Sequence, residues 1–444
     1  MRRFDEKVLI LGLSKSGVAA ARYLNRHGAD IFITESSNQK DSQLVKELES
    51  EGIKVEIGGH SDYFIKDACL AVASPGIPPE SEIFSMLKER RIPVISEIEL
   101  AYKETKKPFI AITGTNGKTT TVTLTSEILC SELKAPACGN IGVPPISLAD
   151  EDNDCYVCEV SSFQMQTTNA FQAQIACFTN FTPDHINWHG SLEKYFEAKA
   201  KLFLPPCEPA FSVLNGADEK LLEFSKRLNN VFLFAKEVED NCCYEKNDAI
   251  YFKRNGVEEE IIKLKDCTLV GEHNYQNIMC SIIVAKLVGI SNENIRKVIS
   301  TFKAPEHRLE FVRNYAGADF YNDSKATNPE AAIVAIKSFN DKKVALIAGG
   351  RDKNTDLKEF CDEVKKHIST VLLIGEASER FEKNLKENGF DNIILEDTME
   401  NAIDKAIEMK HDVVLLSPAC ASFDMFDSYE HRGEVFKNYV LSKS

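Results

Sequence analysis

Short apolar runs alternate with helical patterns along the first hundred residues. The apolar runs occupy residues 7–13, 30–34, 68–73 and 93–96, and a helical pattern over residues 18–27 ends at Gly28. Strands that alternate with helices typically form a parallel sheet wrapped by helices. The pattern therefore predicts a first α/β domain that ends near residue 97.

A second α/β stretch follows a polar, lysine-rich piece at residues 102–107. It opens with an apolar strand that leads into a glycine-rich turn, and it continues to about residue 304. A less periodic, charged stretch at residues 237–260 interrupts the pattern. We expect this stretch to form a peripheral hairpin.

The last segment begins after residues 303–305 and repeats the alternation of strand and helix. Its apolar runs lie at residues 344–348, 370–374, 392–395 and 413–416, which is typical of a doubly wound sheet. A chain of 444 residues also exceeds what one hydrophobic core usually organises. The sequence therefore predicts an α/β protein of three domains. These are a Rossmann-like domain at residues 1–96, a central P-loop ATPase-like domain at residues 97–304 and a Rossmann-like domain at residues 305–444.

The charge balance argues against nucleic acid and membrane partners. Lys and Arg number 53 against 68 Asp and Glu, which gives a formal charge of −15, and no basic run stands out. No apolar run approaches the ~18 residues that a membrane span needs. Arg2 and Arg3 are followed by Asp5 and Glu6 rather than by a long apolar stretch. We expect a cytoplasmic protein that binds neither nucleic acid nor a membrane.

The thirteen cysteines are scattered through apolar runs, which suits buried thiols in a reducing compartment. The pair Cys155-x-x-Cys158 has the spacing of a zinc or redox motif. It lies inside a strand-like run, and no second pair stands at metal spacing. We therefore expect a structural role for both residues.

The turn after the strand at residues 107–112 carries the strongest chemical signal. It reads Gly114-Thr115-Asn116-Gly117-Lys118-Thr119-Thr120 and opens a helix. The glycines let backbone N–H groups surround phosphate oxygens, Lys118 supplies a point charge, and the Thr119 hydroxyl can bind Mg²⁺. The usual P-loop would place its first glycine at Ile112, so this loop is a shorter variant. The sequence predicts an ATP or GTP site.

A second glycine turn follows the first strand and reads Gly12-Leu13-Ser14-Lys15-Ser16-Gly17. Ser14 stands where a dinucleotide fingerprint has its second glycine, so a nucleotide held by helix-terminal N–H groups and hydroxyls fits better than a full dinucleotide. Glu35, at the end of the second strand, is placed to accept hydrogen bonds from a ribose or a base. A plain glycine turn with an exposed glutamate is the alternative.

Other polar motifs follow later strands, and Glu159 after one of them could face the phosphate loop and help to hold Mg²⁺. The motifs include residues 159–164, 180–185, 188–190, 195–199, 271–277 and 305–310. Together they resemble the Mur ligase family, which includes the folylpolyglutamate synthetases. Residues 72–77, 138–142, 322–328 and 416–424 resemble the branch of the family that adds D-glutamate. Branches that add L-alanine or the third residue carry an Ala-His pair where this chain has Ser324-Lys325-Ala326.

The resemblance implies an ATP-dependent amide ligase of cytoplasmic peptidoglycan precursor synthesis. ATP would convert the carboxylate of a UDP-linked muramoyl-alanine into an acyl phosphate, which the amine of D-glutamate would attack. The main tasks of the active site would be to bind the negatively charged reactants next to one another and to neutralise the charge that develops during the reaction. We expect a monomer.

The resemblance also implies the roles of individual residues. The ATP contacts would be Gly114, Thr115, Asn116, Gly117, Lys118, Thr119, Thr120, Asn277, Arg308 and Asp323. Thr119 and Glu159 would hold one Mg²⁺, and His185 with a carbamylated Lys199 would hold a second. Lys118, His185 and Lys199 would be catalytic. The UDP-linked substrate would contact Ser14, Lys15, Ser16, Glu35, Ser74, Gly76 and Asn140. D-Glutamate would contact Lys325, Thr327, Lys353, Ser422, Phe423 and Tyr429.

Other functions remain open from the sequence. A nicotinamide-dependent oxidoreductase would use the Gly12 turn, but Ser14 disfavours it and the Gly114 loop would have no role. A P-loop regulatory protein would bind a nucleotide without turnover that depends on an amino acid. Within the family, a folylpolyglutamate synthetase or the L-alanine-adding ligase is the nearest rival.

Overall fold

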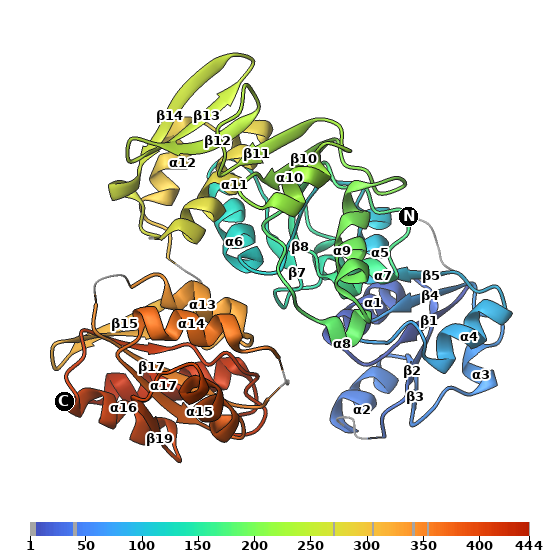
Figure 1. Cartoon of the computed structure of the whole chain (residues 1–444). Helices are drawn as coiled ribbons and strands as arrows, with labels where there is room; N and C mark the ends of the chain where they lie inside the picture. Colours follow the sequence, from blue (N-terminus) through green and yellow to red (C-terminus); the bar gives the residue numbers. More distant parts are fainter. Residues whose placement is uncertain are drawn as a thin grey trace. The chain divides into compact units, whose positions relative to one another are not determined.

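The computed structural model describes residues 6–38, 42–269, 271–303, 306–339, 342–352 and 355–443. The chain divides into two compact units. The first comprises Met1–Cys267 with Gln276–Thr301, and the second comprises Thr268–Tyr275 with Phe302–Ser444. The first unit contains two sheets and the second contains one (Figure 1).

The first sheet has five parallel strands in the order β3-β2-β1-β4-β5. Its strands are β1 (Lys7–Leu11), β2 (Asp30–Glu35), β3 (Lys54–Ile57), β4 (Leu70–Ala73) and β5 (Val94–Ser96). Its helices are α1 (Lys15–Arg26), α2 (Ser42–Ser50), α3 (Asp62–Ile65), α4 (Glu82–Glu89) and α5 (Glu97–Thr105). The strand order reverses direction between β1 and β4. A doubly wound sheet binds ligands beyond the carboxyl ends of its strands at such a point.

The second sheet has nine strands in the order β14-β13-β12-β11-β10-β9-β6-β8-β7. Its strands are β6 (Phe109–Thr113), β7 (Ala137–Gly139), β8 (Tyr156–Glu159), β9 (Ile175–Phe178), β10 (Phe211–Asn215), β11 (Val231–Phe234), β12 (Cys242–Lys246), β13 (Ala249–Arg254) and β14 (Val257–Lys263). Its helices are α6 (Lys118–Leu129), η1 (Pro145–Leu148), α7 (Ser162–Gln166), α8 (Ile186–His189), α9 (Leu192–Ala200), η2 (Lys201–Phe203), α10 (Glu219–Ser225), η3 (Leu264–Asp266), α11 (Glu272–Val288) and α12 (Asn292–Ile299), of which η1, η2 and η3 are 3₁₀ helices. Strands β12, β13 and β14 pair antiparallel and form one edge of the sheet, so the predicted hairpin is part of a three-stranded meander (Figure 1).

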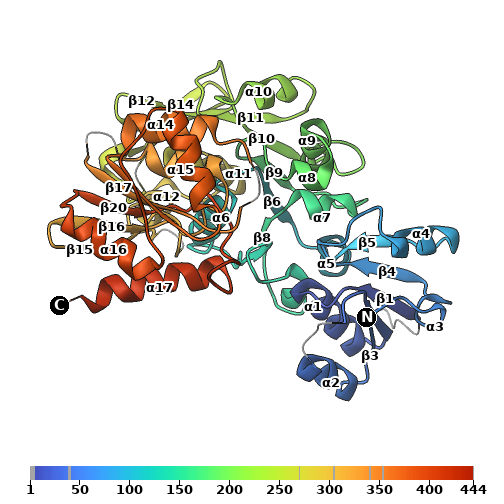
Figure 2. The same cartoon turned by 60° about the horizontal axis from the view of Figure 1, so that its bottom comes forward.

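The third sheet has six strands in the order β15-β16-β20-β17-β18-β19. Its strands are β15 (Glu310–Tyr315), β16 (Ala318–Asn322), β17 (Val344–Gly349), β18 (Thr370–Ile374), β19 (Ile393–Leu395) and β20 (Val413–Leu416). Its helices are α13 (Pro329–Ile336), α14 (Lys358–His367), α15 (Ser378–Glu387), α16 (Met399–Glu408) and α17 (Tyr429–Ser442), the last of which leads to the C-terminus (Figure 2). Among the described strands of this sheet, β15 pairs antiparallel with β16 and the other pairs are parallel.

The three-domain α/β fold predicted from the sequence is confirmed. Residues 304 and 305, at the expected second boundary, lie outside the described residues.

The two cysteines of the Cys155-x-x-Cys158 pair are buried free thiols; Cys155 lies directly before β8 and Cys158 lies in it. Cys69 and Cys130 are exposed, so the expectation of buried thiols is wrong for those two. Among the described helices, none combines the length and the apolar character that crossing a bilayer requires.

Candidate active site

The phosphate loop, residues 114–117, joins the end of β6 to the start of α6. Gly114 has φ +148° and Gly117 has φ +80°, a backbone that side chains rarely allow. A Cβ atom at Gly114 would stand 1.9 Å from Thr179 Oγ1, and one at Gly117 would stand 2.5 Å from Asn277 Oδ1. Gly117 leaves the first turn of α6 without a side-chain cap. A helix that begins directly after a glycine-rich turn presents its first N–H groups in the way that suits a phosphate.

Polar residues after β9 fix the flank of the phosphate loop. The Thr115 N–H donates to Asn180 O at 3.0 Å, and the Asn116 N–H donates to Asn180 Oδ1 at 2.8 Å. Thr179 Oγ1 donates to Asn116 O at 2.6 Å. Strand β9 pairs with β6, so its carboxyl end delivers these residues next to the loop.

Two of the three threonines that open α6 make hydrogen bonds through their hydroxyls. Thr119 Oγ1 donates to Glu159 Oε2 at 2.8 Å, and Thr121 Oγ1 donates to Asn277 Oδ1 at 3.1 Å. Thr120 is buried. The hydroxyls thus offset poor helix propensity, and they bring the predicted residue Asn277 against the loop.

Two lysines converge on the carbonyl groups of the loop. Lys118 Nζ donates to Gly114 O at 2.9 Å and to Thr115 O at 2.7 Å. Lys199 Nζ, at the end of α9, donates to Gly114 O at 2.7 Å, and its side chain is 2% exposed. Burial lowers the pKa of Lys199 well below its ordinary value, and the positive charge of Lys118 lowers it further. Lys199 is therefore an amine that loses its proton easily.

The predicted histidine lies in the same region. His185 has φ +52° and directly precedes α8, and its Nε2 lies 3.4 Å from the Asp184 carboxylate. The ring of Phe163 packs against it edge-on at 4.8 Å. Burial, followed by the charges of His185 and Lys199, lowers the pKa of His189 to about 4. His189 is thus neutral at pH 7, and its Nε2 forms a hydrogen bond with Ser162 Oγ at 3.0 Å.

All seven residues predicted to bind the UDP-linked substrate line one cavity of about 640 Å³, called the amino-terminal cavity below. They are Ser14, Lys15, Ser16, Glu35, Ser74, Gly76 and Asn140. Most of them follow β1, β2 and β4 of the first sheet, and Asn140 follows β7 of the second. The structure therefore brings together residues that are far apart in the sequence.

Hydrogen bonds shape the wall of the amino-terminal cavity. Ser14 Oγ caps α1 by accepting from the Gly17 N–H and donates to Ser74 Oγ at 2.7 Å. The two Glu35 oxygens accept from the Leu13 and Ser37 N–H groups at 3.0 Å each. Glu35 thus organises the loops around the cavity in addition to lining it.

Sequence reasoning missed several lining residues of this cavity. Thr34, Ser36 and His60 also line it, and Thr34 Oγ1 lies 2.7 Å from His60 Nδ1. Thr34 belongs to β2, and Ser36 and His60 follow β2 and β3, so the rule that ligands lie beyond the carboxyl ends of parallel strands could have found them.

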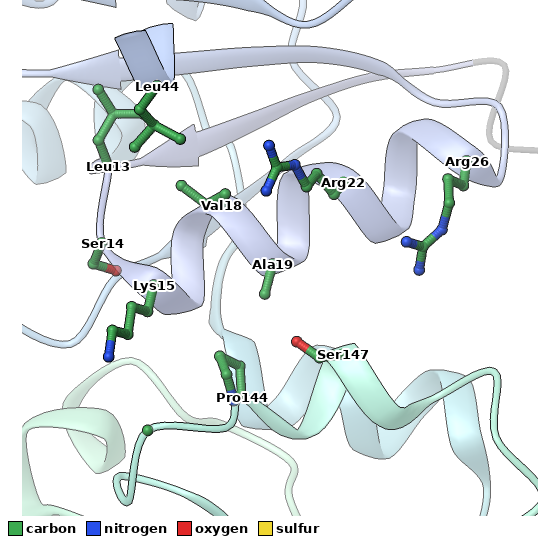
Figure 3. A pocket seen from close by; sticks show the side chains of 11 residues that line it. Leu13, Ser14, Lys15, Val18, Ala19, Arg22, Arg26, Leu44, Pro144 and Ser147 are labelled. Carbon is green, nitrogen blue, oxygen red and sulfur yellow. The ribbon is translucent and has the colours of Figure 1, made fainter. Parts of the chain in front are cut away.

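A smaller pocket of about 450 Å³ adjoins the amino-terminal cavity along α1 (Figure 3). The two share Leu13, Ser14, Lys15, Gly142 and Pro144. Figure 3 shows Pro144 and Ser147 facing the side of α1 that carries Ala19. Segment 142–147 therefore lies close to the glycine turn at residues 12–17.

In the second unit, the predicted residues gather at the carboxyl ends of β16 and β20. Asp323 Oδ1 accepts from the Leu309 N–H at 3.1 Å, and Oδ2 accepts from Ser417 Oγ at 2.7 Å. Burial raises the pKa of Asp323 to about 7, although Ser417 and the charge of Arg308 oppose the shift. Arg308 thus lies close enough to Asp323 for its positive charge to lower the pKa of the carboxyl group.

Of the remaining predicted residues of this unit, Lys325 lies beside Tyr429, the first residue of α17. Lys325 Nζ lies 5.4 Å from the centre of the Tyr429 ring, and the Thr327 N–H donates to Lys325 O. Ser422 is 2% exposed, whereas Phe423 is 64% exposed. Lys353 lies outside the described residues.

Arg432 joins the two loops of this region, although no sequence motif pointed to it. Its buried guanidinium donates to Ser324 Oγ at 2.9 Å and Ser324 O at 2.8 Å, and also to Cys420 O at 3.0 Å and Ala421 O at 3.2 Å. Because Ser324 precedes Lys325 and Ala421 precedes Ser422, Arg432 sets the spacing between the two candidate contacts.

Comparison with known proteins matches three families of domains along the chain. Residues 6–96 match the Mur ligase MurD-like N-terminal domain, residues 112–285 match the Mur ligase middle domain, and residues 307–420 match the Mur ligase glutamate ligase domain. The matched ranges cover most of the chain in the order expected from the sequence.

Two relatives match the chain over nearly its whole length. The chain is 42% identical over 443 residues to the UDP-N-acetylmuramoylalanine–D-glutamate ligase of Koribacter versatilis, covering 98% of this chain and 97% of the relative. It is 38% identical over 441 residues to the protein of the same name from Bacillus cereus, covering 97% and 96%.

Solved structures support the fold. The UDP-N-acetylmuramate-alanine ligase MurC of Thermotoga maritima superimposes with a TM-score of 0.60 at 18% identity, covering 99% of this chain and 100% of that protein. A folylpolyglutamate synthase of Mycobacterium tuberculosis superimposes with a TM-score of 0.58 at 16% identity, covering 76% of this chain and 92% of that protein.

Proposed function

The chain belongs to the Mur ligase family, and from that membership we propose that it joins D-glutamate to UDP-N-acetylmuramoyl-L-alanine at the expense of ATP. The reaction is a step of peptidoglycan precursor synthesis, and thereby of cell-wall growth and division. We assign it to a monomer in the cytoplasm.

One observation carries the proposal beyond the relatives' names. Glu159 accepts from Thr119 Oγ1 of α6 at 2.8 Å and from Asn140 Nδ2 of the amino-terminal cavity at 3.0 Å. A single carboxylate thus connects the phosphate loop with the cavity that suits a UDP-linked substrate. An enzyme that phosphorylates the far end of such a substrate needs this connection, because the two reactants must meet at one point.

The chemistry follows from the weakness of a carboxylate as an electrophile. The substrate carboxylate attacks the γ-phosphorus of ATP, an O–P bond forms, and ADP leaves. The amine of D-glutamate then attacks the acyl carbon, the C–N bond forms, inorganic phosphate leaves, and the amine loses its proton. The N–H groups at the start of α6 and the ammonium of Lys118 balance the charge that moves during the first step.

The residues at the loop suit Mg²⁺, which prefers oxygen ligands. The hydroxyl of Thr119 and the carboxylate of Glu159 would hold one ion, and His185 with a carbamylated Lys199 would hold a second. When bound, Mg²⁺ neutralises phosphate charge and the charge of the acceptor carboxylate. A buried Lys199 with a lowered pKa supports carbamylation, because only the neutral amine reacts with CO₂.

The other roles follow the motifs. We assign ATP binding to Gly114, Thr115, Asn116, Gly117, Lys118, Thr119, Thr120, Asn277, Arg308 and Asp323. We assign binding of the UDP-linked substrate to the seven predicted residues of the amino-terminal cavity, and D-glutamate binding to Lys325, Thr327, Lys353, Ser422, Phe423 and Tyr429.

Phosphate release from ATP tests the proposed function directly. Turnover should require UDP-N-acetylmuramoyl-L-alanine and D-glutamate together, because the carboxylate of the first forms the acyl phosphate and the amine of the second attacks it to release inorganic phosphate. Each candidate amino acid is supplied in turn at a fixed concentration of the UDP-linked substrate. Equal turnover with L-glutamate, or turnover with a folate in place of the UDP-linked substrate, would contradict the assignment.

Arg432→Lys should raise the KM for D-glutamate about tenfold. Lysine keeps the positive charge but cannot reproduce the planar fork that reaches both Ser324 and the Cys420 and Ala421 carbonyls. A tenfold change corresponds to about 1.4 kcal/mol of binding free energy. Steady-state kinetics with D-glutamate varied give the measurement, and the KM for UDP-N-acetylmuramoyl-L-alanine serves as the control. A tenfold rise in both KM values would point to general loosening of the protein instead.

A further inference from the structure

Helix α5 carries two buried carboxylates in its first turn, directly after β5. Glu97 is 3% exposed and Glu99 is 1% exposed. Glu97 Oε1 accepts from the Ile146 N–H at 2.8 Å. Glu99 Oε2 accepts from the Asn169 N–H at 2.5 Å, and Glu99 Oε1 pairs with Lys103 at 2.7 Å. Each carboxylate therefore ties α5 to a different segment of the second sheet's domain.

The segment that Glu97 holds is a wall of the amino-terminal cavity. Ile146 lies in η1, and Gly139, Asn140, Gly142 and Pro144 just before it line the cavity. We call residues 139–146 the wall segment. Figure 3 shows how its Pro144 lies opposite α1.

The wall segment is held at both of its ends. At the first end, the Asn140 N–H donates to Glu159 O at 3.0 Å and Asn140 Nδ2 donates to Glu159 Oε1. At the other end, the Ile146 N–H donates to Glu97. Within the segment, the Gly139 N–H donates to Val143 O at 2.8 Å and closes a turn. Removing Glu97 would thus release one end and leave the other attached.

Glu97 is costly to bury, and its place in the core needs an explanation. Its Oε2 has no hydrogen-bond partner among the described residues, and no ion pair of Glu97 occurs there. Burial raises the pKa of Glu97 to about 8, a shift that the Ile146 N–H only partly opposes, so the group is mostly a neutral acid at pH 7. A buried polar atom left unpaired costs free energy that an apolar side chain would not.

We propose that Glu97 is a positioning residue for the UDP-linked substrate: through the Ile146 N–H it fixes the wall segment of the amino-terminal cavity. The inference rests on the proposed function, since that function supplies the ligand of the cavity. Glu97 itself lies behind the wall segment and acts through it.

Binding of UDP-N-acetylmuramoyl-L-alanine to Glu97→Gln and Glu97→Leu, measured by calorimetry, tests this role. Glutamine keeps an oxygen that accepts from Ile146, so its Kd should stay within about threefold of the wild-type value. Leucine fills the site but accepts nothing, and its Kd should rise about tenfold, the factor expected when one hydrogen bond is lost. In turnover assays, the KM for the UDP-linked substrate should rise with it, while kcat and the KM for ATP change less than twofold.

Glu99→Leu is the matched control, because Glu99 is equally buried on the same turn and holds a segment that does not line the cavity. It should lower Tm without changing the Kd. An equal rise in Kd for both leucine variants, or an unchanged Kd for Glu97→Leu, would overturn the inference. Failure of the wild-type protein to bind the UDP-linked substrate would instead contradict the proposed function.

Hydrogen exchange in the wild-type protein tests the anchor even if Glu97→Leu does not fold. The Ile146 amide should exchange slowly in the free protein, because its hydrogen is bound to a buried acceptor. Exchange as fast as in an exposed loop would overturn the inference.

Discussion

Lys118→Ala should lower turnover about 10³-fold. The lysine charge is most valuable while the phosphoryl group is in transfer, and a contribution of about 4 kcal/mol to the transition state corresponds to that factor. Phosphate release at saturating concentrations of all three substrates measures the loss. Because Lys118 is only half-buried in a surface turn, Tm should change little.

Lys134→Ala provides the control for Lys118→Ala. Lys134 is exposed, and its ammonium pairs with exposed Asp152 at 3.2 Å, an interaction that contributes little to stability. This variant should keep wild-type turnover. A Lys118→Ala enzyme that is folded and nearly as active as the wild type would show that phosphoryl transfer takes place away from the phosphate loop.

Strands buried on both faces gave the clearest signal in the sequence. In β17 and β20 every residue is buried, so an unbroken apolar run marks each strand in the sequence. The edge strand β15 reads Glu-Phe-Val-Arg-Asn-Tyr and is mostly half-exposed, and its pattern gave no comparable signal. For the same reason the charged stretch at residues 237–260 predicted a hairpin but did not reveal that it extends the central sheet through β12.

The candidate site likewise contains residues that the sequence could reveal and residues that it could not. Residues such as Lys118, Ser74 and Asp323 follow strands in recognisable motifs, and parallel strands bring their carboxyl ends together. Arg432 lies on a helix, 108 residues from Ser324, and nothing local marks an arginine that will be buried. Glu97 reads as an ordinary helix-opening glutamate, because burial depends on the second sheet's domain packing over it. Such residues become visible only in three dimensions.

Lys199→Ala should lose most of the activity, and Lys199→Arg should not restore it. An ammonium at this position would repel Mg²⁺ by several kcal/mol in poorly hydrated surroundings. Reaction of the neutral amine with CO₂ forms an N–C bond, releases a proton and turns the cation into an anion with oxygen donors. Arginine stays charged and forms no carbamate, so it retains the conflict.

Two observations in the structure favour this chemistry. Lys199 is 2% exposed, and its pKa lies well below the ordinary value because of burial and the nearby charge of Lys118. The lowered pKa favours the neutral amine at Lys199, whereas Lys194 on the same helix is exposed. Lys194→Ala is the matched control and should keep wild-type turnover.

Labelling with ¹³C-bicarbonate separates a carbamate from a simpler role for Lys199. A carbamate predicts a ¹³C carbonyl signal in the wild-type protein and in Lys194→Ala that is absent from Lys199→Ala. If Lys199 served only as the donor that reaches Gly114 O at 2.7 Å, no such signal would appear and Lys199→Gln would retain activity, because its amide can still donate. That pair of results would remove the second Mg²⁺ site and leave Thr119 and Glu159 as the only ligand pair at the loop.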